Sequence, residues 1–502
     1  MAITKVTSSV LSSGSATDGY VLTADGSGNS AWEEVAGGPT FKTFGTDSIM
    51  IGDDATGTID AANYNTGVGV DVFASLTSGD LNTAVGYTAL QNNTSGAQNT
   101  AIGSRVLPDN TTGLGNVGVG EATLFVNTTG SRNVALGLGV LQNSNSNDNI
   151  AIGYRAQHQV TSAAQNVAIG SDALFTTTSG SNNVGIGYFA LRYNTASGNT
   201  AVGYNSLAAN TTGPYNTAVG YNCLDANTTG DYNTAVGYQA LTANTTAQTN
   251  DAFGYKAGAS ITTGPTNVVV GSFSMDSGGT QTGGGNTHIG HSGSRVLTSG
   301  NHNSSVGISA LAGCTTGMNN TVVGRAAGSA ITTGTNNICI GAYAGLANQP
   351  TTAITTGSGQ IVIGNQDSTN AHIQIDWTVA SDKRDKTDVT PLDMGLDFIN
   401  KLEPVTYKWD KRGKYGEGET PDGTHKESWT DVGFLAQDVE KIEAEFGHKI
   451  EDKTNLTTYV SEDKSSYGLT YAKFIPMLVK SVQELSTQVN ELKSELLTLK
   501  GE

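Results

Sequence analysis

A serine and a lysine that lie close together along the chain are the side chains in this sequence best placed to do chemistry together. They are the two ends of the hexapeptide Ser381 to Lys386, which also contains Asp382 and Arg384. A serine hydroxyl is a poor nucleophile unless a nearby base takes its proton. A lysine can be that base only if desolvation or cationic neighbours lower its pKa toward neutrality, and Arg384 could supply such a field. Taken alone, the hexapeptide fits an exposed helix cap better than a catalytic pair.

Other groups that could do chemistry are few. The three cysteines are widely separated, and none lies in a CxxC motif, so we interpret them as small core side chains. His288, His291 and His302 raise the question of a metal site, but without further ligands they are better interpreted as turn residues. No metal or cofactor site is predicted. Acidic residues fall at irregular positions before residue 380, so no paired-carboxylate cleft for glycoside hydrolysis is predicted either.

The composition favours a repetitive β-rich fibre over a set of compact domains. With 65 glycines, 37% hydrophobic and 14% charged residues in 502, the chain has too little apolar material for three cores and too little charge for a disordered polymer. The formal net charge of -18 argues against nucleic acid as a partner, because phosphate contacts need clustered cations. The opening residues lack the pattern of a secretory signal, and no apolar run long enough for a membrane span follows. We therefore expect no membrane insertion and synthesis in a cytoplasm.

The elements that must position these residues begin with a repeat of the form NTAVGYxALxxNTTGxY. Its glycines recur with a constant period over most of the chain, apart from two shorter steps and longer insertions at two places; the first are Gly52, Gly69, Gly86, Gly103, Gly120 and Gly137. An Asn lies four positions before the glycine in most units, as at Asn82, Asn99, Asn133, Asn216, Asn233 and Asn337. In a coil that closes once per repeat, these Asn side chains would stack and hydrogen-bond as a ladder.

Two apolar columns are predicted from the same phase. The Val or Ile before each glycine forms one of them: Val85, Ile102, Val119, Ile152, Val202, Val219 and Val236. A leucine forms the other: Leu90, Leu107, Leu124, Leu174, Leu207, Leu224 and Leu241. Such columns argue against a low-complexity linker, and the NTTG segments are interpreted as turns, not glycosylation sites.

A single thin coil would expose a long apolar seam, which three chains packed along one axis would cover. The repeats resemble the head repeats of trimeric autotransporter adhesins, and this resemblance implies a trimeric β-roll. The predicted fold class is thus mainly β: an elongated trimeric β-roll or β-helix of about 17-residue repeats, followed by an α+β domain that ends in a long coiled-coil helix.

The character of the chain changes near residue 380, since positions 1–380 hold 29 charged residues and the much shorter stretch 381–502 holds 41. The end of the chain shows a heptad pattern over four repeats. Its a and d positions are Ile475, Leu478, Val482, Leu485, Val489, Leu492, Leu496 and Leu499. This pattern predicts a coiled coil, and a single amphipathic helix packed on its own domain is the alternative.

Two segments of this charged region are distinctive: WTVASDKRDKTDVTPLDMGLDFINKLEPVTYKW from Trp377 to Trp409, and DVGFLAQDVEKI from Asp431 to Ile442. They resemble the chaperone domain at the C-termini of phage endosialidases, other tailspikes and fibres. The resemblance implies a domain that trimerises, brings the upstream fibre into register and then cuts itself off beside its opening serine. It further implies that Ser381 is the nucleophile and Lys386 the base, with Asp382 and Arg384 in support, and that the scissile bond lies on the Ala380 or the Asp382 side.

These arguments divide the chain into four regions: a virion-attachment segment at 1–40, a β-roll shaft at 41–365, a distal tip or linker at 366–380, and a chaperone auto-processing domain at 381–502 with its coiled-coil helix at about 471–499. We expect a homotrimeric phage tail fibre that acts in the virion. Its expected partners are a tail or adaptor protein at the N-terminus and a host surface receptor, either a polysaccharide or an outer-membrane component. A tailspike that degrades polysaccharide and a bacterial surface adhesin are the alternatives. The only enzymatic activity expected is one self-cleavage.

Overall fold

The computed structural model describes residues 47–52, 61–346, 353–365, 367–368, 371–372, 374, 379–415, 420–461 and 466–501, and the backbone alone of 20–24, 30–34 and 40–44. The chain divides into two compact units, Met1–Ser292 and Gly293–Glu502, and each is described by itself. Most of the predicted attachment segment at 1–40 and of the predicted tip at 366–380 lies outside the described residues.

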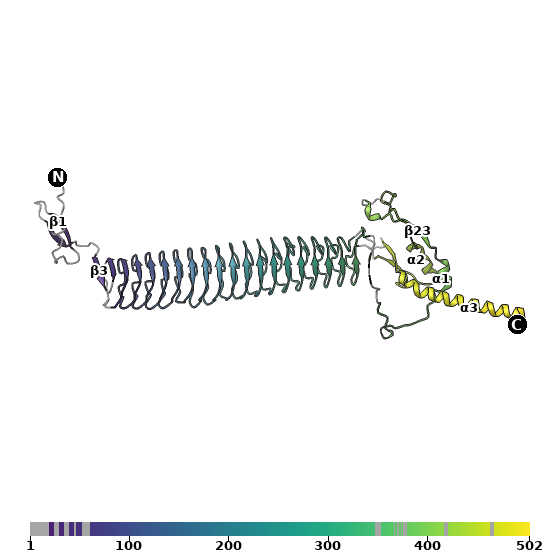
Figure 1. The fold of residues 1–502 in the computed structure, drawn as a ribbon, viewed down its shortest axis with the longest axis horizontal. Helices are drawn as coiled ribbons and strands as arrows, with labels where there is room; N and C mark the ends of the chain where they lie inside the picture. The colour runs from purple at the N-terminus through teal and green to yellow at the C-terminus, as the bar shows by residue number, and fades with distance from the viewer. Residues whose placement is uncertain are drawn as a thin grey trace. The chain divides into compact units, whose positions relative to one another are not determined.

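The first unit is a stack of parallel coils with one short strand per repeat (Figure 1). Two antiparallel pairings precede the stack: β1 (Tyr20–Ala24) with β2 (Ser30–Glu34), and β3 (Thr40–Phe44) with β4 (Ser48–Gly52). From β4 each strand pairs in parallel with the next, in register. The strands are β5 (Thr66–Gly69), β6 (Thr83–Val85), β7 (Thr100–Ile102), β8 (Val117–Val119), β9 (Val134–Leu136), β10 (Ile150–Ile152), β11 (Val167–Ile169), β12 (Val184–Ile186), β13 (Thr200–Val202), β14 (Thr217–Val219), β15 (Thr234–Val236), β16 (Asp251–Phe253), β17 (Val268–Val270) and β18 (Thr287–Ile289).

The second unit begins with coils of the same kind and continues into an α+β segment. Its parallel strands are β19 (Ser304–Val306), β20 (Thr321–Val323), β21 (Ile338–Ile340) and β22 (Ile361–Ile363). The α+β segment contains α1 (Leu396–Lys401), β23 (Val405–Tyr407), β24 (Asp431–Gly433), α2 (Ala436–Glu445), β25 (Thr458–Val460), β26 (Tyr467–Leu469) and α3 (Phe474–Lys500). The predicted fold class, a mainly β solenoid of 17-residue repeats followed by an α+β part with a long final helix, is confirmed.

The predicted Val and Ile column is present, and it lies on the outer face of the coils. Val85 pairs with Ile102 in register, so the column does stack, but Ile102 is 40% exposed. The buried residue of each three-residue strand is the central one, as at Ala84 and Ala101. Because side chains alternate across a strand, a buried central alanine sends both of its neighbours outward. The interior of the coil is narrow, and the outer face of each strand carries the larger apolar side chains.

The leucine column lies inside the coil as predicted. Leu90, Leu107 and Leu124 are fully buried, and each has a left-handed backbone with φ near +50°. This conformation costs a non-glycine residue on the order of 1–2 kcal/mol. Here it closes a hydrogen bond between coils, since the Leu90 N–H donates to the Val106 carbonyl at 3.1 Å. Burial of the leucine and this bond offset the local strain.

The predicted asparagine ladder is present and fully buried. The backbone N–H and the Nδ2 of Asn99 both donate to Asn82 Oδ1, at 3.0 and 3.1 Å, and Nδ2 also donates to the Gly113 carbonyl at 2.9 Å. The NTTG segments add a second ladder that sequence reasoning treated only as turns. In it, Asn110 Nδ2 donates to Asn93 Oδ1 at 2.9 Å. Both ladders satisfy polar groups that the thin coil would otherwise leave unpaired.

The repeated glycine is required by close packing between coils. Gly103 has φ +131°, and a Cβ added to it would overlap the carbonyl oxygen of Gly120 in the next coil. A side chain at this position would therefore push two coils apart. The constant spacing of the glycines in most repeats follows from this contact.

We expect Asn116→Ala to destabilise the solenoid strongly. Asn116 Oδ1 accepts from the backbone N–H and the Nδ2 of Asn133, so the substitution leaves two buried donors unpaired, at a cost on the order of 2–5 kcal/mol. Thermal unfolding followed by circular dichroism measures the loss. Asn92→Ala is the matched control, because Asn92 is exposed and its Nδ2 donates at the surface to the partly buried Asp109. Equal melting temperatures for the two variants would contradict the ladder's role.

Candidate Ser–Lys site

The structure brings Ser381 and Lys386 into direct contact. Lys386 Nζ donates to Ser381 Oγ at 2.6 Å and lies 3.4 Å from the Ser381 carbonyl oxygen. A short 3-10 helix, Lys383–Asp385, separates the two residues. Its tight turn folds the chain back so that the lysine reaches the serine. The short stretch of chain between the two residues therefore allows the lysine amine to lie within hydrogen-bonding distance of the serine hydroxyl.

Asp382 and Arg384 engage each other and not the serine. Asp382 is the N-cap of the 3-10 helix and accepts from the Arg384 backbone N–H at 2.9 Å. The guanidinium also binds the carboxylate, with Nη2 to Oδ2 at 2.6 Å. This side-chain hydrogen bond lowers the pKa of Asp382 and raises that of Arg384. The charge of Arg384 is thus largely offset by Asp382, and Lys386 is the cation hydrogen-bonded to the serine.

The whole segment around this pair is exposed in the single chain. Ser381, Asp382, Arg384 and Lys386 are all exposed. On either side, Val379 is 81% and Val389 is 76% exposed. An exposed lysine donates as an ammonium, and an ammonium cannot accept the serine proton. Exposed valines beside the pair give the segment apolar surface that another molecule could cover.

The α+β segment downstream of the pair has its own small core. Met394, Phe398 of α1, Val439 of α2, and Phe474 and Met477 of α3 are buried together. The side chain of Glu484 on α3 accepts from the Leu396 N–H at 2.7 Å, at the start of α1. This hydrogen bond, together with Lys480, lowers the pKa of Glu484. The first turns of α3 are therefore anchored on α1.

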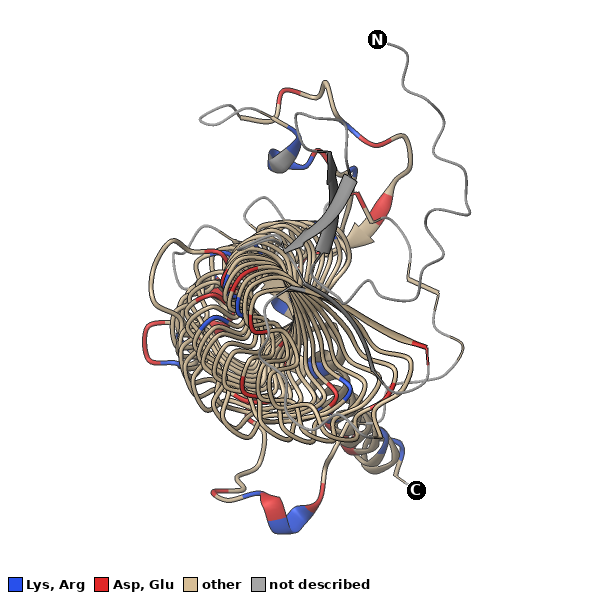
Figure 2. Ribbon diagram, turned by 90° about the vertical axis from the view of Figure 1, so that its left-hand side faces the viewer, with Lys and Arg blue, Asp and Glu red and all other residues tan. Residues whose placement is uncertain are grey.

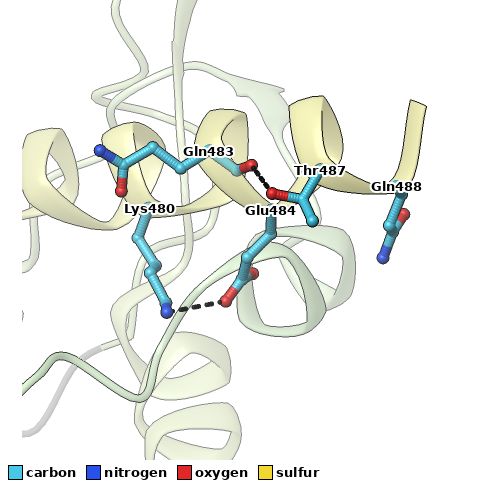
Figure 3. A pocket seen from close by; sticks show the side chains of 5 residues that line it. All are labelled: Lys480, Gln483, Glu484, Thr487 and Gln488. Atoms are coloured by element: carbon cyan, nitrogen blue, oxygen red, sulfur yellow. Dashed lines mark hydrogen bonds and ion pairs between the residues drawn. The ribbon is translucent and has the colours of Figure 1, made fainter. Parts of the chain in front are cut away.

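A shallow depression lies beside this anchor. It has a volume of about 340 Å³ and is lined by Lys480, Gln483, Glu484, Thr487 and Gln488, all from α3 (Figure 3). Figure 3 shows Lys480 and Glu484 directed toward each other, in the ion pair of 3.2 Å. The depression is open and polar, and we assign no ligand to it.

A buried acid fastens α2 to β25. The carboxylate of Glu443 is fully buried and accepts from the backbone N–H and the hydroxyl of both Thr457 and Thr458. Four donors around one carboxylate satisfy the charge without a cation. Sequence reasoning missed this residue, because its helix reads as an ordinary charged amphipathic segment.

The histidines and cysteines do not assemble into a site within the described residues. No group of three or more His, Cys, Asp or Glu in that part of the chain could hold a metal ion. The interpretation of His288 as a turn residue was wrong: it is the buried central residue of β18, where burial lowers its pKa to about 4. Burial also raises the pKa of Cys223 to about 12. Among the described helices, none is both long and apolar enough to cross a membrane.

The fold and this pair together define a β-solenoid protein with a C-terminal α+β domain that opens on an exposed Ser–Lys contact. Residues 381–448 match the family model described as "Chaperone of endosialidase", so the second unit carries an endosialidase-type chaperone domain. The match begins at Ser381 and ends after α2, so that α3 lies beyond it. No match was found among curated proteins or among solved structures.

Proposed function

We propose that this protein is a homotrimeric phage tail fibre whose C-terminal domain directs trimerisation and is released by one self-cleavage beside Ser381. The observation that carries the proposal is the chaperone-family match that begins at Ser381, downstream of a solenoid built from near-identical coils. Coils that all follow one period can pair in several registers at similar energy. A terminal chaperone that joins three chains would set the register before the coils close.

The final helix supports assembly through this domain. Phe474 and Met477 face the core of their own domain, while the heptad seam remains exposed. The eight seam residues expose between two fifths and more than four fifths of their surface: Ile475, Leu478, Val482, Leu485, Val489, Leu492, Leu496 and Leu499. A helix with one face packed and a second apolar face exposed is suited to join parallel copies of itself. The packed face fits a helix that lies on its own domain, and the exposed seam supports the predicted coiled coil.

The outer faces of the coils offer a second surface for the copies. In most coils the last residue of the strand is apolar and partly exposed. Examples are Ile102 and Val219 in the first unit, and Val306 and Val323 in the second. These side chains form an apolar stripe that repeats with the coils, while charged residues are sparse on the coils (Figure 2). Three chains that met along this stripe would remove it from water, at about 25 cal/mol per Å² of apolar surface.

The Ser381–Lys386 pair provides the chemistry for self-cleavage. A neutral Lys386 amine takes the proton of Ser381 Oγ, and the oxygen attacks the carbonyl carbon of the adjacent peptide bond. An ester forms, the C–N bond breaks, and the departing amine takes the proton from the Lys386 ammonium. Water then hydrolyses the ester. Acid and base are thus the same lysine, at 2.6 Å from the hydroxyl.

The exposure of the pair implies that assembly must precede cleavage. Water around an exposed Lys386 favours its charged form, which cannot act as a base. Packing of three chains over Val379 and Val389 would exclude water from around the lysine and so disfavour a charged amine there. In this proposal a lone chain stays intact, and a correctly assembled trimer cuts itself.

We expect the double variant Leu485→Asp, Leu492→Asp to abolish trimers of the full chain. At each of the two positions, three carboxylates would be buried close together in the seam, and their charged forms would be strongly disfavoured. Light scattering should show trimers for the wild type and monomers for the variant. Gln488→Asp, on an exposed polar position of the same helix, should remain trimeric. A folded, monodisperse monomer of the wild type would contradict the proposed trimer.

We expect the wild type to separate into two bands on a denaturing gel, and Ser381→Ala to run as one full-length band. Lys386→Met should also stay intact because it has no base, whereas Lys383→Met, in the same 3-10 helix, should still cleave. Mass spectrometry of the new terminus would locate the bond on the Ala380 or the Asp382 side. One full-length band for wild type and Ser381→Ala alike would refute self-cleavage.

Virion composition tests the proposal as a whole. Mass spectrometry of purified virions should detect peptides from the region before Ser381 and, if the domain is released, few or none from the region after it. A purified fibre that liberates reducing ends from host polysaccharide would instead favour the degrading tailspike. Detection of the protein only on bacterial envelopes would favour the surface adhesin.

A further inference from the structure

Five tyrosines on consecutive coils form a continuous aromatic ladder on the surface of the first unit. They are Tyr188, Tyr204, Tyr221, Tyr238 and Tyr255, each directly after the repeated glycine. Neighbouring ring centroids lie 5.0 to 5.4 Å apart, and the ring planes differ by only 6° to 11°. Each tyrosine remains 42 to 44% exposed. Sequence reasoning recorded the tyrosine in the repeat motif and gave it no role.

The ladder is local, whereas the apolar stripe of the strands is not. Earlier coils have only isolated tyrosines at the position after the glycine, Tyr87 and Tyr154; others have Ser104, Glu121 or Leu138 there, and Ser171 directly precedes the ladder. Beyond Tyr255 the parallel stacking ends, since Phe273 meets that ring edge-on at 65°. An interface between copies of a solenoid must recur in every coil. A cluster confined to five coils is better explained by recognition of something else.

Mutual stacking fixes how this ladder can bind. The faces of the inner rings cover one another, and Phe189 lies against Tyr188 with the ring centroids 3.8 Å apart. The edges of the rings and the phenol hydroxyls are what the surface presents. Within the described residues none of the five hydroxyls has a hydrogen-bond partner, so each can donate and accept. Stacking also holds the side chains in place, so little rotamer entropy remains to be lost on binding.

The surroundings of the ladder are nearly neutral. From Gly187 to Lys256 the chain has one Arg, one Lys and three Asp as its only charged residues, and Lys256 Nζ lies 5.9 Å from the centre of the Tyr255 ring. A polyanion would meet no cluster of cations here, and a basic protein would meet few acids. A row of hydroxyls with apolar edges between them, repeating at about the spacing of stacked strands, matches a neutral polymer whose units are also ringed by hydroxyls.

We propose that the ladder from Tyr188 to Tyr255 is a binding site for an extended, uncharged polysaccharide that lies along the coils. The phenol hydroxyls hydrogen-bond successive sugar units, and the ring edges pack against their C–H surfaces. This inference rests on the proposed function as a receptor-binding fibre and names the receptor chemistry and the place where it binds.

The test uses the trimer that the full chain forms, after self-cleavage has run to completion, on an array of immobilised neutral polymers: dextran, amylose, mannan, galactan and β-glucan, with hyaluronan and alginate as polyanions. The variant Tyr204→Ser, Tyr221→Ser, Tyr238→Ser replaces three rings with the residue that the same position has at Ser104 and Ser171. We expect the wild type to bind at least one neutral polymer, and the variant to bind it at least about tenfold more weakly. The matched control is Tyr215→Ser, Tyr232→Ser, a stacked and exposed pair outside the ladder, which should bind as the wild type does.

Several outcomes would overturn the assignment. They are no binding to any neutral polymer, equal binding by the ladder variant, equal loss in the control, or a preference for the polyanions. Nitration by tetranitromethane distinguishes a site from an interface: the ladder tyrosines should be modified in the wild-type trimer, and their protection would mean that another copy covers them. Light scattering of each variant separates failure of this inference from failure of trimerisation, because a trimer that binds no glycan refutes the ladder site alone.

Discussion

The structure depends on hydrogen bonds between successive coils, because a coil of this size has no core of its own. Each strand is short and buries one side chain, such as Ala84, so the coil interior holds little more than these residues and the leucine column. Stability comes from bonds that cross from coil to coil: backbone pairs, the Asn82 and Asn99 ladder, and the leucines held in a left-handed backbone. Each coil of such a solenoid is stabilised by the coils on either side of it, so the solenoid is least stable at its two ends.

This constraint explains both the regularity of the chain and the problem that regularity creates. A Cβ at Gly103 would strike the next coil, so the spacing of glycines is kept, and every coil then resembles the next. Similar coils have similar outer faces. Chains that pack through such faces can therefore pair in several registers at similar energy. A separate domain with its own packed core, built around Phe398 and Phe474, supplies a contact that the coils cannot.

Sequence reasoning predicted those features that depend on phase alone. The 17-residue coil, the buried Leu90 column and the Asn99 ladder all follow from residues that recur at one spacing. The Ile102 column also stacks, but the face on which it lies did not follow from phase, because such short strands give alternation too little length to show which face is buried. It could not foresee leucines with φ near +50°, since left-handed backbone is typical of glycine and asparagine. The buried His288 was misread because it was judged by its residue type and not by its phase, since it lies two residues before Gly290 as Ala84 does before Gly86.

The Ser–Lys site shows the same division between what local sequence determines and what assembly must add. The 3-10 turn after Asp382 is enough to bring Lys386 Nζ to 2.6 Å from Ser381 Oγ. The turn cannot keep water away, and the Asp382–Arg384 ion pair leaves no spare positive field to shift the lysine. In the proposed mechanism the geometry is encoded in one hexapeptide, while the exclusion of water that the chemistry needs would come from surfaces contributed by other copies. Because the geometry of the pair and the removal of water from it would have separate origins, a chain could form the Ser–Lys contact during synthesis and cleave only after its coils have closed.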